Sequence, residues 1–255
     1  MKKNILCMAA AMMIATVSWA QSDYKVITVK GVSFKMIKVA GGTFLMGCTP
    51  EQEDVTGSDG GAYPVHSVTL SDYYIGETEV TQWMWEAVMG SNPSKRKGHM
   101  LPMDNVSWND CQEFIRRLNS KTGRRFRLPT EAEWEFAARG GTRSKHYKYA
   151  GSNDIEVVAW YGHNGGTLLP EKVKTKAPNE LEIYDMSGNV DEWCQDIHKE
   201  YSREAQINPV VDDNYGSRVL RGGRANSSRL LCRVSARCND HVNDQRHGFR
   251  LVLSE

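Results

Sequence analysis

Residues 127–141, RLPTEAEWEFAARGG, contain a complete signal for one short helix. Thr130 can cap the first turn with its hydroxyl, and Glu133 stands three residues later, as in a capping box. Three apolar side chains follow at helical spacing: Trp134, Ala137 and Ala138. Gly140 is the expected stop, because glycine readily takes the left-handed conformation that ends helices. The stretch predicts a helix with one face packed into a core.

Two further helices are expected upstream. Residues 107–123, SWNDCQEFIRRLNSKTG, begin with Ser107 as the N-cap and end at Gly123. The face expected to be buried carries Trp108, Cys111, Phe114, Ile115 and Leu118. A shorter helix is expected from Thr81 to Met89.

Strand patterns flank these helices. Residues 24–47 alternate apolar and polar side chains and break at glycines, which predicts strands joined by tight turns. Residues 67–80 predict one or two more strands, and residues 247–253, HGFRLVL, predict the last one. After residue 140 the pattern is irregular. The prediction is a single α+β domain with few regular elements and long loops, which often carry binding or catalysis.

The first twenty residues resemble a secretory signal peptide. Lys2 and Lys3 precede an apolar run, and Ser18 and Ala20 are small residues at a cleavage point. We expect an exported protein, periplasmic, at the cell surface or secreted, with a mature domain at residues 21–255 and no transmembrane anchor. Loss of two lysines leaves 30 Lys+Arg against 31 Asp+Glu, a net charge of −1. That charge balance does not predict the positively charged surface with which proteins bind nucleic acid.

Export also bears on the cysteines. The mature chain keeps five of the six cysteines, since Cys7 lies in the signal peptide. An oxidising compartment permits disulfides, and an odd number leaves at least one thiol unpaired within the chain. The pairing stays open at this point.

Six segments in one order carry a resemblance to a known family. They are GGTFLMG, ETEVTQWMWEAVMG, PMDNVSWNDCQEFIRRLN, RFRLPTEAEWEFAARGG, NELEIYDMSGNVDEWC and RVLRGG…HGFRLVL. Their order is similar to that of the sulfatase-modifying-factor family, the formylglycine-generating enzymes, over residues 32–253. The resemblance implies a loop-rich variant of the C-type-lectin fold. It does not by itself imply the activity, because function resides in sites.

The family's enzymes use copper(I) held by two thiolates to oxidise a sulfatase cysteine with oxygen, and soft sulfur suits that ion. Their segment reads Gly-Gly-Ser-x-x-Cys-x-x-x-x-Cys. In this chain Arg224 occupies the position of the serine, and Ser227 occupies the position of the first cysteine. Only the second cysteine is matched, by Cys232. If residues 232–238 are extended, Cys238 lies roughly 20 Å from Cys232, too far to share an ion. A turn would shorten that distance. Copper is therefore not expected.

Cys232 has three interpretations: a remaining catalytic ligand, a buried thiol, or half of a disulfide with Cys111, Cys194 or Cys48. The last two are favoured. Asp191 also departs from the family, whose enzymes have tryptophan there. The expected ligand groove carries Asp191, Arg224, Asn226, Ser227, Arg229 and Arg233, with Asn239 and His241 beside them.

A calcium site is the metal prediction. The resemblance places the ion on the side chains of Asp185 and Glu192 and the carbonyls of Gly188 and Val190, and calcium prefers such oxygen ligands. The histidines show no metal-binding spacing, and His241 and His247 are expected on the surface of a loop.

Two functions follow from these residues. The favoured one is a non-catalytic binding or structural module of the cell envelope or exterior, with a protein or glycan ligand. The alternative is a copper-dependent oxidoreductase that converts a sulfatase cysteine to formylglycine or oxidises another protein thiol through Cys232.

Overall fold

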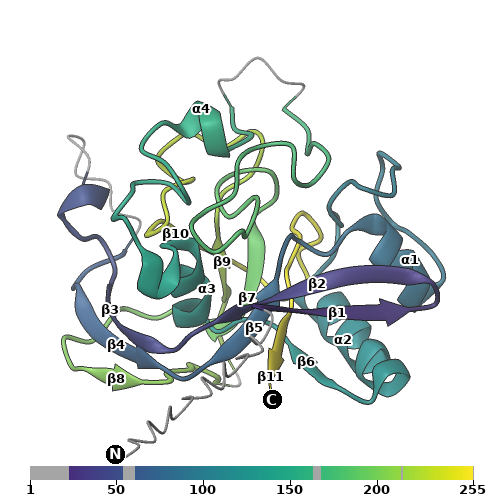
Figure 1. The fold of residues 1–255 in the computed structure, drawn as a ribbon, viewed down its shortest axis with the longest axis horizontal. Coiled ribbons are helices and arrows are strands. Elements are labelled where there is room, and N and C mark those ends of the chain that lie inside the picture. The colour runs from purple at the N-terminus through teal and green to yellow at the C-terminus, as the bar shows by residue number, and fades with distance from the viewer. Residues whose placement is uncertain (1–22, 54–60, 163–167, 214, 255) are drawn as a thin grey trace, which may run out of the picture.

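The computed structural model describes residues 23–53, 61–162, 168–213 and 215–254. The predicted signal peptide lies outside these residues. A five-stranded sheet runs through the molecule (Figure 1), and all its neighbouring strands are antiparallel. In spatial order its strands are β1 (Tyr24–Val29), β2 (Val32–Val39), β5 (Tyr73–Gly76), β11 (Val252–Ser254) and β6 (Arg125–Arg127).

The first two strands form a tight hairpin, as the break at Gly31 predicts. Lys30 and Gly31 connect Val29 to its partner Val32. Both connecting residues have positive φ, 44° and 81°. Turns of that hand match the twist of the paired strands, and glycine takes such φ values without steric cost.

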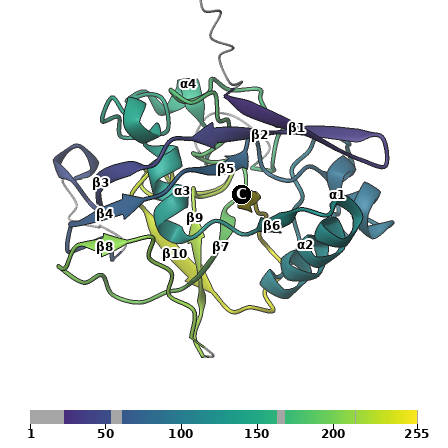
Figure 2. The same cartoon turned by 60° about the horizontal axis from the view of Figure 1, so that its bottom comes forward.

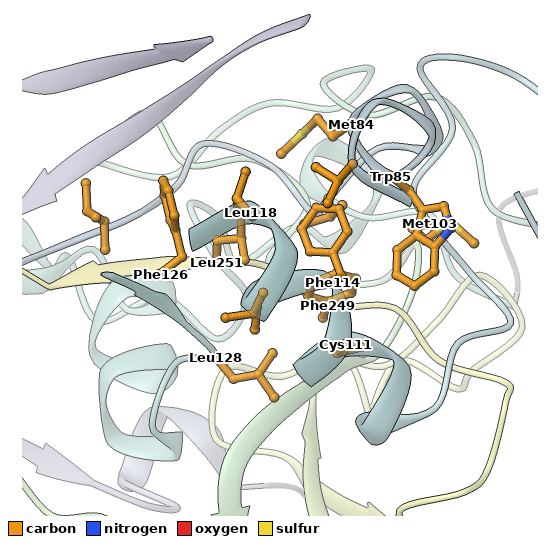
Figure 3. Close-up of a cluster of buried hydrophobic side chains, with 14 of the residues drawn as sticks. Met84, Trp85, Met103, Cys111, Phe114, Leu118, Phe126, Leu128, Phe249 and Leu251 are labelled. Carbon is orange, nitrogen blue, oxygen red and sulfur yellow. The ribbon is translucent and has the colours of Figure 1, made fainter. Parts of the chain in front are cut away.

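Two helices pack beside this sheet, α1 (Gln82–Met89) and α2 (Trp108–Thr122). Figure 3 shows the core that they share, where Trp85 and Phe114 stack with ring centroids 5.3 Å apart and Phe249 meets both rings edge-on. Ser107 is the N-cap of α2, as predicted, and forms a capping box with Asp110; Gly123 ends the helix in a left-handed conformation. The predicted face is buried except for Trp108, which is half-buried.

The third helix, α3 (Glu131–Ala138), confirms the signal in the opening stretch. Thr130 accepts from the Glu133 amide, and the Glu133 carboxylate accepts from the Thr130 amide. Every residue of α3 is buried, because the helix packs among strands of two smaller sheets.

Those two sheets lie on either side of α3 (Figures 1 and 2). One contains β3 (Gly42–Met46), β4 (His66–Leu70) and β8 (Gln206–Ile207), and the other contains β7 (Glu192–Ile197), β9 (Arg218–Arg221) and β10 (Arg237–Asp240). The remaining elements are α4 (Ile155–Val158) and the 3₁₀ turns Pro50–Gln52 and Gly141–Arg143.

The architecture is α+β and loop-rich, as predicted. The last strand begins later than the expected residue 247, because residues 247–249 bond to loops and to β7 instead of forming a regular ladder. In the part of the chain that the structure describes, we find no helix with the length and apolar character needed to cross a bilayer.

Candidate functional site

The functional segment begins where β9 ends. Gly222 and Gly223 both have positive φ, 90° and 68°, and turn the chain away from the sheet. A Cβ atom on Gly223 would lie 2.8 Å from the carbonyl oxygen of Leu231. Only glycine fits so close an approach. The loop at 224–236 therefore folds back against its own start before β10 begins.

Cys232 is fully buried on this loop. It belongs to a small cluster with Tyr149, Ile155, Val158, Ala159 and Tyr161. Its Sγ lies 3.6 Å from the carbonyl oxygen of Ser228, within reach of a weak hydrogen bond. Burial raises the pKa of the Cys232 thiol to about 12, so the thiol is neutral at ordinary pH. These features agree with the buried-thiol interpretation.

The expected disulfides are not found. The five cysteines that the structure describes are all free. Cys111, Cys194 and Cys232 each pack in a different hydrophobic cluster, which keeps their thiols apart.

The assumption of an extended chain from Cys232 to Cys238 is wrong. Residues 232–236 form turns, and the Ala236 amide donates to the Arg233 carbonyl at 3.1 Å. The two cysteines still have different surroundings. Cys232 lies in its own small cluster, whereas Cys238 packs on the main core and lines a surface cavity.

That cavity has a volume of about 180 Å³. Its polar wall consists of Asp191, Arg224, Ser227, Asn239, Asp240 and His247. A second cavity of about 130 Å³ lies beside it and includes Asn226 and Arg246. Asp191 and Arg224 line both cavities and form an ion pair, with Arg224 Nε 3.2 Å from Asp191 Oδ2. We call the two cavities together the groove.

The structure thus brings together four of the six expected groove residues: Asp191, Arg224, Asn226 and Ser227. Arg229 is exposed and lines neither cavity. Arg233 is buried, and its guanidinium donates to the carbonyls of Leu230 and Gln52. The prediction for Arg233 is wrong because the turn at 232–236 points it inward.

His247 was expected on the surface, and it is fully buried. The Gly248 amide donates to the Asp191 carbonyl, and the Trp193 amide donates to the Gly248 carbonyl. These bonds hold His247 alongside the start of β7, where its Nδ1 lies 2.8 Å from Asp191 Oδ1. The sequence signal for this burial was the position of His247 at the start of the apolar segment 247–253.

Both carboxylate oxygens of the predicted calcium ligand Glu192 already accept hydrogen bonds. Its Oε2 accepts from Trp134 Nε1 at 2.7 Å and from Arg250 Nε at 2.6 Å, and its Oε1 accepts from Arg250 Nη2 at 2.6 Å. An arginine already neutralises this carboxylate. Glu192 therefore fits an ion pair better than a calcium ligand.

A buried carboxylate from another segment contacts this motif and has one oxygen without a hydrogen-bond partner. Glu79 is fully buried; its Oε1 accepts from Asn189 Nδ2 at 3.0 Å, and its Oε2 has no hydrogen-bond partner. Burial raises the pKa of Glu79, and the charge of Asp185 raises it further. Burial also raises the pKa of Asp185 to about 6. Glu79 and Asp185 are thus two buried acids whose charges disfavour each other, a type of donor that hard cations prefer.

Comparison with known proteins gives a consistent result. A family model described as the sulfatase-modifying factor enzyme 1-like domain matches residues 28–255. The chain is 36% identical to the chaperone protein LppX of Paenibacillus barcinonensis, over 60% of this chain and 74% of that protein. It is 32% identical to the formylglycine-generating enzyme of Streptomyces coelicolor, over 54% of this chain and 48% of the enzyme. The solved structure of Treponema denticola variable protein 1 superposes with a TM-score of 0.80 at 31% identity, covering 92% of this chain and all of that one.

Proposed function

The chain belongs to the family of the sulfatase-modifying factor enzyme 1-like domain, and on that premise we propose that it is a non-catalytic module that binds a polar ligand in the groove. The observation that carries the proposal is the Asp191–Arg224 ion pair, whose two residues line both cavities, with Arg224 in the segment where the family's enzymes have a thiolate pair.

The thiol chemistry of the enzymes lacks support in these residues. Ser227 occupies the position of the first cysteine and is buried, with its Oγ accepting from the Arg224 amide at 3.1 Å. The Cys232 thiol is buried and neutral, and it does not line the groove. Copper(I) needs thiolate ligands that substrate and oxygen can reach. We therefore favour binding over sulfatase-cysteine oxidation.

The chemistry of the groove indicates the class of ligand. Arg224 keeps 34% of its side chain exposed, and Asn226 is also exposed, so both can turn toward a ligand. A guanidinium, a carboxylate and amides suit carboxylate, amide and hydroxyl groups. A peptide segment or a glycan carries such groups. The chaperone name of LppX is compatible with a binding role.

We further propose that calcium stabilises the base of this region through Asp185 and Glu79, with carbonyl oxygens of Gly188 and Val190. The supporting observation is the buried Glu79 oxygen without a partner. The signal-peptide pattern of the first twenty residues leads us to place the module in the cell envelope or outside the cell.

Peptide and glycan arrays probed with the purified protein test the binding proposal. We expect a restricted set of polar ligands, and at least a tenfold loss of affinity for Arg224→Ala, because a charge-assisted contact contributes about 1.5–3 kcal/mol. Arg143→Ala is the matched control. Arg143 is exposed and pairs with Asp23, and both residues are far from the groove residues in the sequence. Equal binding by the wild type and Arg224→Ala would refute the groove as the site.

A further inference from the structure

We propose that Asp240, Asp244 and His247 form a site for a divalent transition-metal ion, with zinc as the ion that the donor set fits best. Asp240 ends β10, Asp244 lies on the following turn, and His247 is held against the start of β7. One oxygen from each acid and one imidazole nitrogen lie within 4.8 Å of one another. No other such group of three occurs among the described His, Cys, Asp and Glu side chains.

The distances match the spacing of zinc ligands. His247 Nε2 lies 3.3 Å from Asp240 Oδ2 and 3.4 Å from Asp244 Oδ1. Two ligand atoms that are each about 2.0–2.1 Å from a tetrahedral zinc ion lie roughly 3.4 Å apart. The imidazole nitrogen therefore already lies at the required separation from one oxygen of each acid.

Asp191 provides the support that metal-binding histidines usually have. Its Oδ1 lies 2.8 Å from the opposite ring nitrogen, Nδ1, and Trp193 meets the ring edge-on at 4.7 Å. A carboxylate on the far nitrogen fixes the ring and the tautomer, so that the near nitrogen presents its lone pair to the metal.

The two ring nitrogens of His247 both contact carboxylates. A neutral imidazole has one N–H, yet both ring nitrogens of His247 face carboxylates. If the proton is on Nδ1 and bonds to Asp191, the Nε2 lone pair faces Asp240 and Asp244, which are acceptors. If the proton is on Nε2, the lone pair faces Asp191. In the first arrangement the Nε2 lone pair lies where an ion shared with Asp240 and Asp244 would bind.

Arg246 is the nearest competitor for the two acids. Its Nη2 donates to Asp240 Oδ2 at 2.9 Å, and its Nε donates to Asp244 Oδ1 at 2.7 Å. However, 61% of its side chain is exposed, and exposed ion pairs are weak. An incoming ion can displace it into solvent.

Asp240 and His247 also line the groove, so a bound ion would stand at its wall. The metal site nevertheless rests on its own geometry. It can exist whether or not the groove binds a peptide or glycan.

Calorimetric titration of the whole purified protein with Zn²⁺ tests the inference, supported by the visible spectrum of bound Co²⁺. We expect one equivalent to bind. Asp240→Asn and Asp244→Asn should each weaken binding by about tenfold or more. Asp213→Asn, an exposed acid paired with Lys199, is the matched control and should bind as the wild type does.

Two more variants keep the test decisive. Arg246→Gln should bind zinc more tightly, because the competing guanidinium is gone. Cys238→Ser should bind as the wild type does, which excludes a thiolate site in the same cavity. The proposal is overturned if no ion binds, if both asparagine variants bind as the wild type does, or if Cys238→Ser abolishes binding. Each of these variants changes a side chain outside the fully buried core, and circular dichroism confirms folding.

Discussion

Arg250 and Glu192 form a fully buried ion pair at the base of the groove region. The Arg250 guanidinium also donates to the carbonyls of Gly76 and Tyr184. The remaining Glu192 contact is the indole of Trp134 on α3. One pair of side chains therefore connects β5, the segment before β7, and α3.

Loss of one partner should be severe. Arg250→Met leaves a buried carboxylate without its counter-charge, and we expect a loss of about 3–5 kcal/mol in the free energy of unfolding. Urea denaturation measures it. The double variant Arg250→Met, Glu192→Gln should recover part of that loss, since no unpaired charge remains. Arg116→Met, at an exposed pair, is the control. Equal stability of Arg250→Met and the control would contradict this account.

Individual roles in the site were only partly predictable. Asp191, Arg224, Asn226 and Ser227 lie close together in two sequence motifs, and the structure does bring them to one groove. The partner of Glu192 is 58 residues away, and local sequence does not reveal such pairs. The burial of His247 depends on backbone bonds to β7, which also lie outside any local pattern.

At the scale of elements, the turn at Gly188 shapes the region before β7. Gly188 has a φ of 79°, and its neighbour Asn189 donates from its amide to the Trp160 carbonyl at 2.9 Å. A Cβ on Gly188 would lie 2.1 Å from that same carbonyl oxygen. No side-chain rotation can relieve a clash with backbone.

Gly188→Ala should therefore cost more than the strain of a positive φ alone. Gly31 is a matched control, because it has a φ of 81° and nothing within 4 Å of the added methyl group. We expect about 1–2 kcal/mol for Gly31→Ala and more than about 3 kcal/mol for Gly188→Ala. Thermal and urea unfolding provide both values. If the two variants lose the same stability, close packing at Gly188 is not the reason for the glycine.

Helices were the most predictable elements. Each of α2 and α3 carries its own cap, apolar face and stop within one stretch, so sequence alone defines it. Strand ends were less predictable. The chain from His247 to Leu251 has the alternation of a strand, but the bonds of residues 247–249 go to loops and to β7.

At the scale of the whole molecule, buried charges order a chain that has little regular structure. Arg221 on β9 pairs with Glu135 on α3 and donates to the carbonyls of Ser235 and Ala236. Arg237 on β10 pairs with Glu131 at the start of α3. Both ends of the loop that walls the groove are thereby attached to α3. The groove keeps its shape because its loop is anchored in the core.

We propose that this groove binds a ligand and does not oxidise thiols. The most direct measurement combines Cu(I) titration against a competing chelator with mass spectrometry of a Cys-x-Pro-x-Arg peptide incubated with the protein, Cu(I) and oxygen. An active formylglycine-generating enzyme serves as the positive control. We predict no stoichiometric copper binding and no aldehyde in the peptide. One equivalent of Cu(I), lost in Cys232→Ser, together with aldehyde formation would contradict the claim.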